Sequence, residues 1–123
     1  MILLAYRIIY KGDSAMKINK FCENKVGAAP AGHFNMNGFP VMTEGKITIG
    51  MSFYLPGGGT EMLGVANECY YHIIEGQMTV TMENGEEHLL TAGDTIMFAP
   101  GDVKKTENTG LSVTRMMVIS VKP

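Results

Sequence analysis

The sequence of 123 residues is poor in three features that mark particular classes of protein: cysteine, charge of one sign and long apolar runs. Its two cysteines, Cys22 and Cys69, are too few for the disulfide framework that stabilises many small secreted domains. The formal net charge of −2 provides no general attraction for nucleic acid or for an anionic membrane. We therefore expect neither nucleic acid nor a membrane among the partners of this protein.

The N-terminal run MILLAYRIIYKGD starts with apolar residues but is shorter than the ~20 residues that cross a bilayer. No basic segment precedes it, and no small-residue cleavage site follows it. We therefore expect a cytoplasmic protein. The length fits a single domain with a core of its own.

Strand signals dominate the chain, and no segment keeps a helical period. Residues 46–55 alternate around β-branched and aromatic side chains and end at Pro56 and a glycine triplet, which predicts a strand running into a loop. Glu75-Gly76 and Asn84-Gly85 predict tight turns between strands. Further strands are predicted at residues 69–74, 77–82, 86–90, 95–98, 104–108 and 112–121. The pattern is typical of a small antiparallel β architecture.

Two spaced motifs narrow this prediction. The first contains Gly57, Leu63, Val65, Cys69 and Gly76, and the second contains Gly93, Ala99-Pro100-Gly101, Lys104 and Asn108. Their spacing resembles that of the cupin family, in which glycine is followed by His-x-His, Glu and Gly, and later by Pro-x-Gly, His and Asn. The resemblance covers roughly residues 46–121. It implies an all-β fold, an antiparallel double-stranded β-helix or jelly-roll barrel, at residues 41–123.

Residues 1–40 differ from the rest, because 27–32 and 37–40 are interrupted by glycine and proline. We expect them to form an N-terminal arm. In cupins such an arm often adds to the sheet of a partner, so the resemblance implies a homodimer with the arm at the interface. An unpaired apolar strand edge is also a liability that pairing removes.

The four positions at which cupins hold a divalent metal such as iron, manganese, nickel or zinc are occupied here by Leu63, Val65, Cys69 and Lys104. Leucine and valine offer no lone pair, and a lysine ammonium must lose its proton before it can bind a metal. Cys69 alone would supply one ligand. We therefore predict no resident metal and no other cofactor.

The facing of Glu68 stays open at this point, because a one-residue bulge would turn it into the barrel in place of Cys69. If a divalent metal bound after all, a non-standard set of His33, Glu68 and Cys69 would hold it. His33 would reach the cavity if the arm folded over the barrel mouth. The alternative for His33 is an ordinary loop residue.

Strand alternation sorts the remaining candidates into possible interior faces. The three sets are Cys69, Tyr71 and Ile73; Lys104, Thr106 and Asn108; and Val113, Arg115, Met117 and Ile119. Burial would lower the pKa of Lys104 and make it a base or a Schiff-base nucleophile. Alternatively, Lys104 pairs with Glu68 or Glu61. A buried Arg115 would bind a carboxylate ligand through two hydrogen bonds, whereas an outward Arg115 would stabilise a dimer.

Two functional hypotheses follow. In the preferred one, an apolar barrel binds a small carboxylated or aromatic molecule, with ligand-binding candidates Glu61, Cys69, Arg115, Met97 and His33. In the alternative, the chain is an enzyme of the isomerase, decarboxylase or lyase type that the resemblance implies. Such an enzyme would be metal-free, with acid–base roles for Lys104, Glu68 and Tyr71, or would use the non-standard metal site.

Overall fold

Apolar and polar residues alternate along most of the chain, with turn residues at close intervals, and this pattern produces strands. The structure, a computed structural model, describes residues 8–10 and 16–123. One 3-10 turn, η2 (Phe21–Glu23), is the only helical element described, and it is far too short to cross a membrane. The strands are β1 (Ile8–Tyr10), β2 (Lys17–Asn19), β3 (His33–Met42), β4 (Ile47–Thr60), β5 (Leu63–Gly64), β6 (Cys69–Glu75), β7 (Gln77–Met82), β8 (Glu87–Thr91), β9 (Thr95–Phe98), β10 (Val103–Glu107) and β11 (Thr114–Val121).

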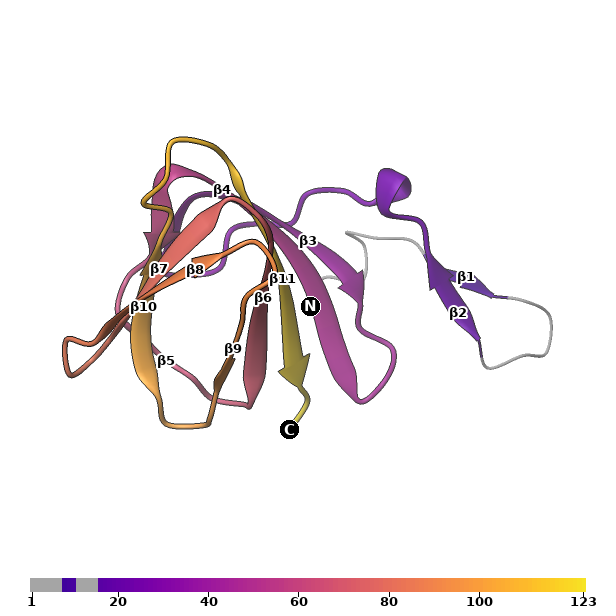
Figure 1. Cartoon of the computed structure of the whole chain (residues 1–123). Helices are drawn as coiled ribbons and strands as arrows, with labels where there is room; N and C mark the ends of the chain where they lie inside the picture. The colour runs from indigo at the N-terminus through magenta and orange to yellow at the C-terminus, as the bar shows by residue number, and fades with distance from the viewer. Residues whose placement is uncertain (1–7, 11–15) are drawn as a thin grey trace.

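The barrel is one antiparallel sheet with the strand order β8-β7-β10-β4-β11-β6-β9, to which β3 adds beside β4 and β5 beside β10. Strand β4 joins the two halves, because its first part pairs with β11 and its end pairs with β10 at Gly59 and Glu107. The sheet curls so that the two halves face each other (Figure 1). The predicted all-β jelly-roll barrel is confirmed.

Strand β4 continues past Pro56 to Thr60, although the sequence predicted a loop there. The glycines explain the difference, because they let two backbones approach where a side chain would collide. A Cβ atom at Gly59 would lie 1.9 Å from the carbonyl oxygen of Thr106 in β10. Gly57 has a φ of +81°, which favours glycine over other residues. The glycine triplet therefore extends the strand across the two halves of the sheet.

The expected arm divides into two parts. Strands β1 and β2 form a separate two-stranded sheet that lies to one side of the barrel (Figure 1). Strand β3, in contrast, pairs with β4 from His33 to Met42 and so belongs to the barrel sheet. The expected boundary between residues 40 and 41 falls within β3. Residues 1–7 and 11–15 of the expected arm lie outside the described residues.

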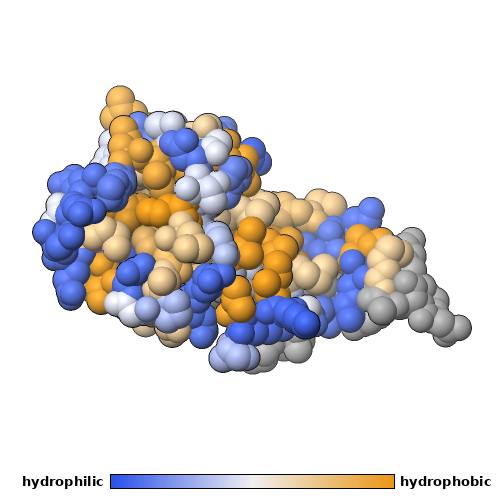
Figure 2. Space-filling model, turned by 60° about the horizontal axis from the view of Figure 1, so that its bottom comes forward, coloured by the Kyte–Doolittle hydropathy of each residue, from blue (hydrophilic) through white to orange (hydrophobic). Residues whose placement is uncertain are grey.

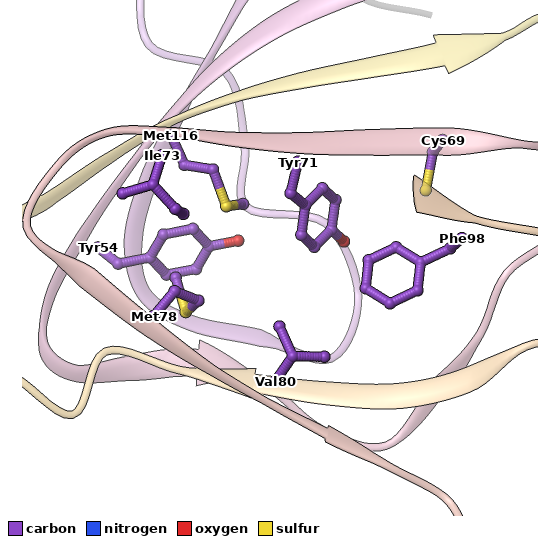
Figure 3. Close-up of a cluster of buried hydrophobic side chains, with 8 residues drawn as sticks. All are labelled: Tyr54, Cys69, Tyr71, Ile73, Met78, Val80, Phe98 and Met116. Carbon is purple, nitrogen blue, oxygen red and sulfur yellow. The ribbon is translucent and has the colours of Figure 1, made fainter. Parts of the chain in front are cut away.

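The core fills the space between the two halves of the sheet (Figure 3). Its buried apolar members are Tyr54, Cys69, Tyr71, Ile73, Met78, Val80, Phe98 and Met116. Alternation predicted the inward facing of Cys69, Tyr71 and Ile73, and that of Lys104, Thr106 and Asn108, all of which are buried. For β11 the expectation was wrong, because the face of Val113 and Arg115 does not point into the barrel. Thr114 and Met116 on the opposite face are fully buried, whereas Val113 is exposed. Periodicity does not distinguish the faces of β11, since both carry methionine and β-branched residues.

Candidate functional site

A cavity of about 710 Å³ lies against strands β3 and β4 and reaches into the barrel at Tyr54, Tyr71 and Val118. Its wall is mostly apolar and includes Met36 and residues of the segment 27–30. Apolar surface also gathers between hydrophilic margins on the underside of the molecule (Figure 2). A volume of this size, with an apolar wall and few polar groups, suits a small organic ligand.

Two buried tyrosines form the inner end of the cavity. Burial raises the pKa of Tyr54 to about 12, although a hydrogen bond from Ser52 opposes the rise. Burial also raises the pKa of Tyr71, and the neighbouring Tyr54 and Cys69 add to this effect. Both phenols therefore keep their protons at neutral pH and can donate hydrogen bonds.

Lys104 lies behind Tyr71 in the barrel interior, and only 4% of its surface is exposed. Its Nζ donates a hydrogen bond of 2.7 Å to the hydroxyl oxygen of Tyr71. The same nitrogen lies 4.9 Å from the centroid of the Tyr71 ring and 5.3 Å from that of Phe98. Within the described part of the chain, no carboxylate forms an ion pair with Lys104. Its charge is stabilised by one phenol oxygen and two aromatic faces.

Burial lowers the pKa of Lys104, while the nearby Cys69 opposes this shift. Burial conversely raises the pKa of the Cys69 thiol, with the charge of Lys104 opposing and that of Asp102 reinforcing the rise. Both Cys69 and the exposed Cys22 are free cysteines. The interior thus holds an amine with a weakened preference for its charged form next to a largely protonated thiol.

The residues at the cupin metal positions do not fit a divalent metal. Leu63 pairs with Lys104 between β5 and β10, and Val65 packs against the core. Neither side chain has a donor atom, and Lys104 already donates to Tyr71. In residues 8–10 and 16–123, no group of three or more His, Cys, Asp and Glu side chains could hold a metal ion. We therefore derive no metal-dependent step.

Glu68 points away from the barrel interior. Its carboxylate accepts a hydrogen bond from the hydroxyl of Tyr70, which lies on the opposite face of β6 from Tyr71. Cys69 takes the inward position and pairs with Phe98 of β9. The open question of register is thereby answered in favour of Cys69. Glu68 is consequently separated from Lys104 and Tyr71, and the set His33, Glu68 and Cys69 does not converge.

Four of the five expected ligand-binding residues do not line the cavity, and neither does Lys104. Cys69 is buried in the core. Arg115 is on the outer face of the sheet, where its Nη2 lies 3.7 Å from Oε1 of Glu75. Met97 alternates with the buried Phe98 and is 56% exposed. Glu61 is exposed beyond the end of β4. His33 does line the cavity, and its Nδ1 lies 3.1 Å from the carbonyl oxygen of Ala31.

Sequence reasoning missed the contributions of Met36, Ser52 and Tyr54 to the cavity. Met36 lies in β3, which was expected to belong to a separate arm. Ser52 and Tyr54 share the inner face of β4, and both are buried. Their alternation with Met51, Phe53 and Leu55 was the available signal, but aromatic residues on both faces obscured it.

Comparisons with known proteins agree with this geometry. A family model described as cupin domain matches residues 50–120. A protein named β-D-galactosidase from Mycobacterium tuberculosis is 27% identical over 97 residues, which cover 76% of this chain and 83% of that protein. Two crystal structures share the fold. An RmlC-like cupin from Shewanella frigidimarina NCIMB 400 has a TM-score of 0.73 and 11% identity, covering 86% of this chain and 90% of that chain. A polyketide cyclase from Streptomyces resistomycificus has a TM-score of 0.71 and 14% identity, and the match covers 79% of this chain and 72% of that chain.

Proposed function

The chain belongs to the cupin domain family, and we propose that its cavity binds a small aromatic or carboxylated molecule. One observation carries the proposal. Tyr71 lines an apolar cavity, and its hydroxyl receives a hydrogen bond from the buried Lys104. That bond is the only one recorded for this hydroxyl within the described residues. Its proton is therefore available to an oxygen atom of a ligand.

The charge of Lys104 makes the Tyr71 hydroxyl a stronger hydrogen-bond donor. A phenol that accepts a hydrogen bond from an ammonium becomes a better donor through its own O–H. A ligand carboxylate or carbonyl at this position would also bring compensating negative charge toward the buried Lys104. The remainder of the ligand would pack against Met36, Tyr54 and Val118, where apolar burial is favourable.

The Tyr71–Lys104 pair also favours a second candidate, an enzyme in which a phenol and an amine exchange protons with the substrate. The activity named for the mycobacterial relative receives less support. Glycosidases commonly use two carboxyl groups that flank the scissile bond. Among the described residues that line the cavity, Glu44 is the only acidic one.

A second copy of the chain is the partner that we propose for the outer face of β3 and β4. A groove of about 350 Å³ on this face is lined by Phe21, Phe39, Phe53, Leu55 and Val113, together with Asn37. The rings of Phe39 and Phe53 pack edge to face at 5.5 Å, and Phe21 of the arm covers both. Leu55 remains 53% exposed. Covering this apolar surface would stabilise a homodimer.

Ligand-observed NMR with benzoate and benzyl alcohol tests the binding proposal. Gly50 lines the cavity, and a Cβ atom there would meet its nearest neighbour at an ordinary 3.5 Å. Gly50→Leu should therefore fill the cavity without disrupting the strand and should abolish the transfer signals of both probes. Gly64→Leu is the matched control, because a Cβ atom at this exposed position meets nothing within 4 Å. Equal signals from both variants would refute binding in this cavity.

A further inference from the structure

We infer, resting on the proposed binding function, that His33 selects aromatic ligands that carry a hydroxyl group, because its Nε2 accepts a hydrogen bond from them. His33 is half-buried at the start of β3 and lines the cavity. Its Nδ1 lies 3.1 Å from the carbonyl oxygen of Ala31. The proposed ligand class is thereby narrowed to phenols and aromatic alcohols.

The contact with Ala31 determines which ring nitrogen of His33 carries the proton. A carbonyl oxygen only accepts hydrogen bonds, so Nδ1 is the donor. In a neutral imidazole the other nitrogen then keeps a lone pair. Within residues 8–10 and 16–123, no group forms a hydrogen bond with Nε2 of His33. This nitrogen is therefore an acceptor that a ligand hydroxyl can satisfy.

A tight turn positions the His33 ring before a ligand arrives. The backbone N–H of His33 donates a hydrogen bond of 3.1 Å to the carbonyl oxygen of Pro30. Gly32 has a φ of +75°, which suits the third position of a type II turn. The N–H of Glu61 donates a bond of 2.8 Å to the carbonyl oxygen of Gly32, which attaches the turn to the end of β4. An acceptor that is already in place loses less conformational entropy on binding.

The wall around His33 favours a ligand with one hydroxyl group on an aromatic ring. Pro30 and Met36 lie on the same mostly apolar wall. A sugar would bury many hydroxyl groups there without partners, which is costly. A carboxylate has no proton to donate to a neutral Nε2. A phenol or an aromatic alcohol satisfies Nε2 with one proton and buries its ring against the wall.

Phenol and anisole test the inference, because they differ only by a methyl group on the oxygen. Ligand-observed NMR titrations at pH 8, at which an ordinary imidazole is neutral, give both Kd values. Burial of the extra methyl group favours anisole, so a preference for phenol requires a polar partner. The ratio of the anisole Kd to the phenol Kd should fall by about 2- to 10-fold in His33→Leu, the effect of losing one hydrogen bond.

Two further variants separate the acceptor from the bulk of the side chain. His33→Gln supplies an amide oxygen as an acceptor and should retain part of the preference for phenol. His88→Leu is the matched control, because His88 is exposed on β8 and does not line the cavity. This variant should leave the ratio of the two Kd values unchanged.

Nitrogen NMR of the full chain labelled with 15N-histidine detects the contact in the wild type. Phenol should shift the Nε2 resonance of His33, which is assigned by its absence in His33→Gln, and anisole should not. A ratio that His33→Leu leaves unchanged, or an Nε2 resonance that phenol does not shift, would overturn the inference. If these results are found while benzoate still binds the cavity, the binding function stands without the role of His33. If phenol, anisole and benzoate all fail to bind, both proposals fail.

Discussion

The Nζ of Lys104 donates a hydrogen bond of 2.7 Å to the hydroxyl of Tyr71 inside the barrel. The two residues come from facing halves of the sheet, β10 and β6, so this bond crosses the interior. Lys104 occupies one of the positions of the cupin metal ligands, and the bond joins it to a tyrosine that lines the cavity. In the proposed binding function, a proton donor beside a positive charge would take the place of the metal ion.

Tyr71→Phe should destabilise the protein by about 1–3 kcal/mol, because it leaves the buried ammonium of Lys104 without its hydrogen-bond partner. Urea unfolding followed by circular dichroism measures the effect. Tyr70→Phe is the matched control, since Tyr70 lies on the opposite face of β6 and bonds to Glu68. Its free energy of unfolding should be nearly that of the wild type. Equal losses in the two variants would show that the Tyr71–Lys104 bond does not stabilise the interior.

The alternation of side chains predicts part of this interior and not the rest. Cys69, Tyr71 and Lys104 could be placed inside because their strands have one clearly apolar or motif-bearing face. Arg115 could not, because Met116 and Met117 give both faces of β11 the same character. The cavity depends on the pairing of β3 with β4, a contact between distant segments that no local pattern encodes. For the same reason, the sequence did not identify Met36 and Ser52 as residues that line the cavity.

The stability of the wild type should rise with pH relative to Lys104→Met. The folded-state pKa of Lys104 is lowered by burial, below its ordinary value of 10.5. Between these two values the unfolded chain binds more protons, so the free energy of unfolding increases with pH. Above about 9 the raised pKa of Cys69 has the opposite effect. Urea unfolding of both proteins from pH 6 to pH 10.5 measures the difference. Parallel pH profiles over this range would contradict the burial penalty on Lys104.

Elemental analysis of the native protein should find no stoichiometric iron, zinc, manganese or nickel. The expectation follows from the side chains at the metal positions, because Leu63 and Val65 have no donor atoms and Lys104 is engaged with Tyr71. Inductively coupled plasma mass spectrometry of protein purified without chelators makes the measurement. Near-stoichiometric metal that survives dialysis would contradict this interpretation of the interior.

Leu55→Glu should dissociate the proposed homodimer, because it places a charge in the outer groove beside Phe53. Leu89→Glu is the matched control, since Leu89 is similarly exposed, at 57% against 53%, and lies on β8 outside the groove. Light scattering coupled to size-exclusion chromatography gives the mass of each variant. A wild-type monomer, or a dimer that both variants retain, would exclude this face as the interface.

Calorimetric titration of benzoate into the wild type, Lys104→Met and Lys105→Met tests most directly whether the Tyr71–Lys104 pair anchors a ligand. Removing the buried charge should weaken benzoate binding by about 10- to 100-fold, the effect of losing a charge-assisted interaction. Lys105→Met removes an exposed charge from the same strand and should leave the Kd unchanged. Two results would contradict the account. Benzoate would bind the wild type and Lys104→Met equally well, or it would bind neither the wild type nor Lys105→Met, the two proteins that retain Lys104.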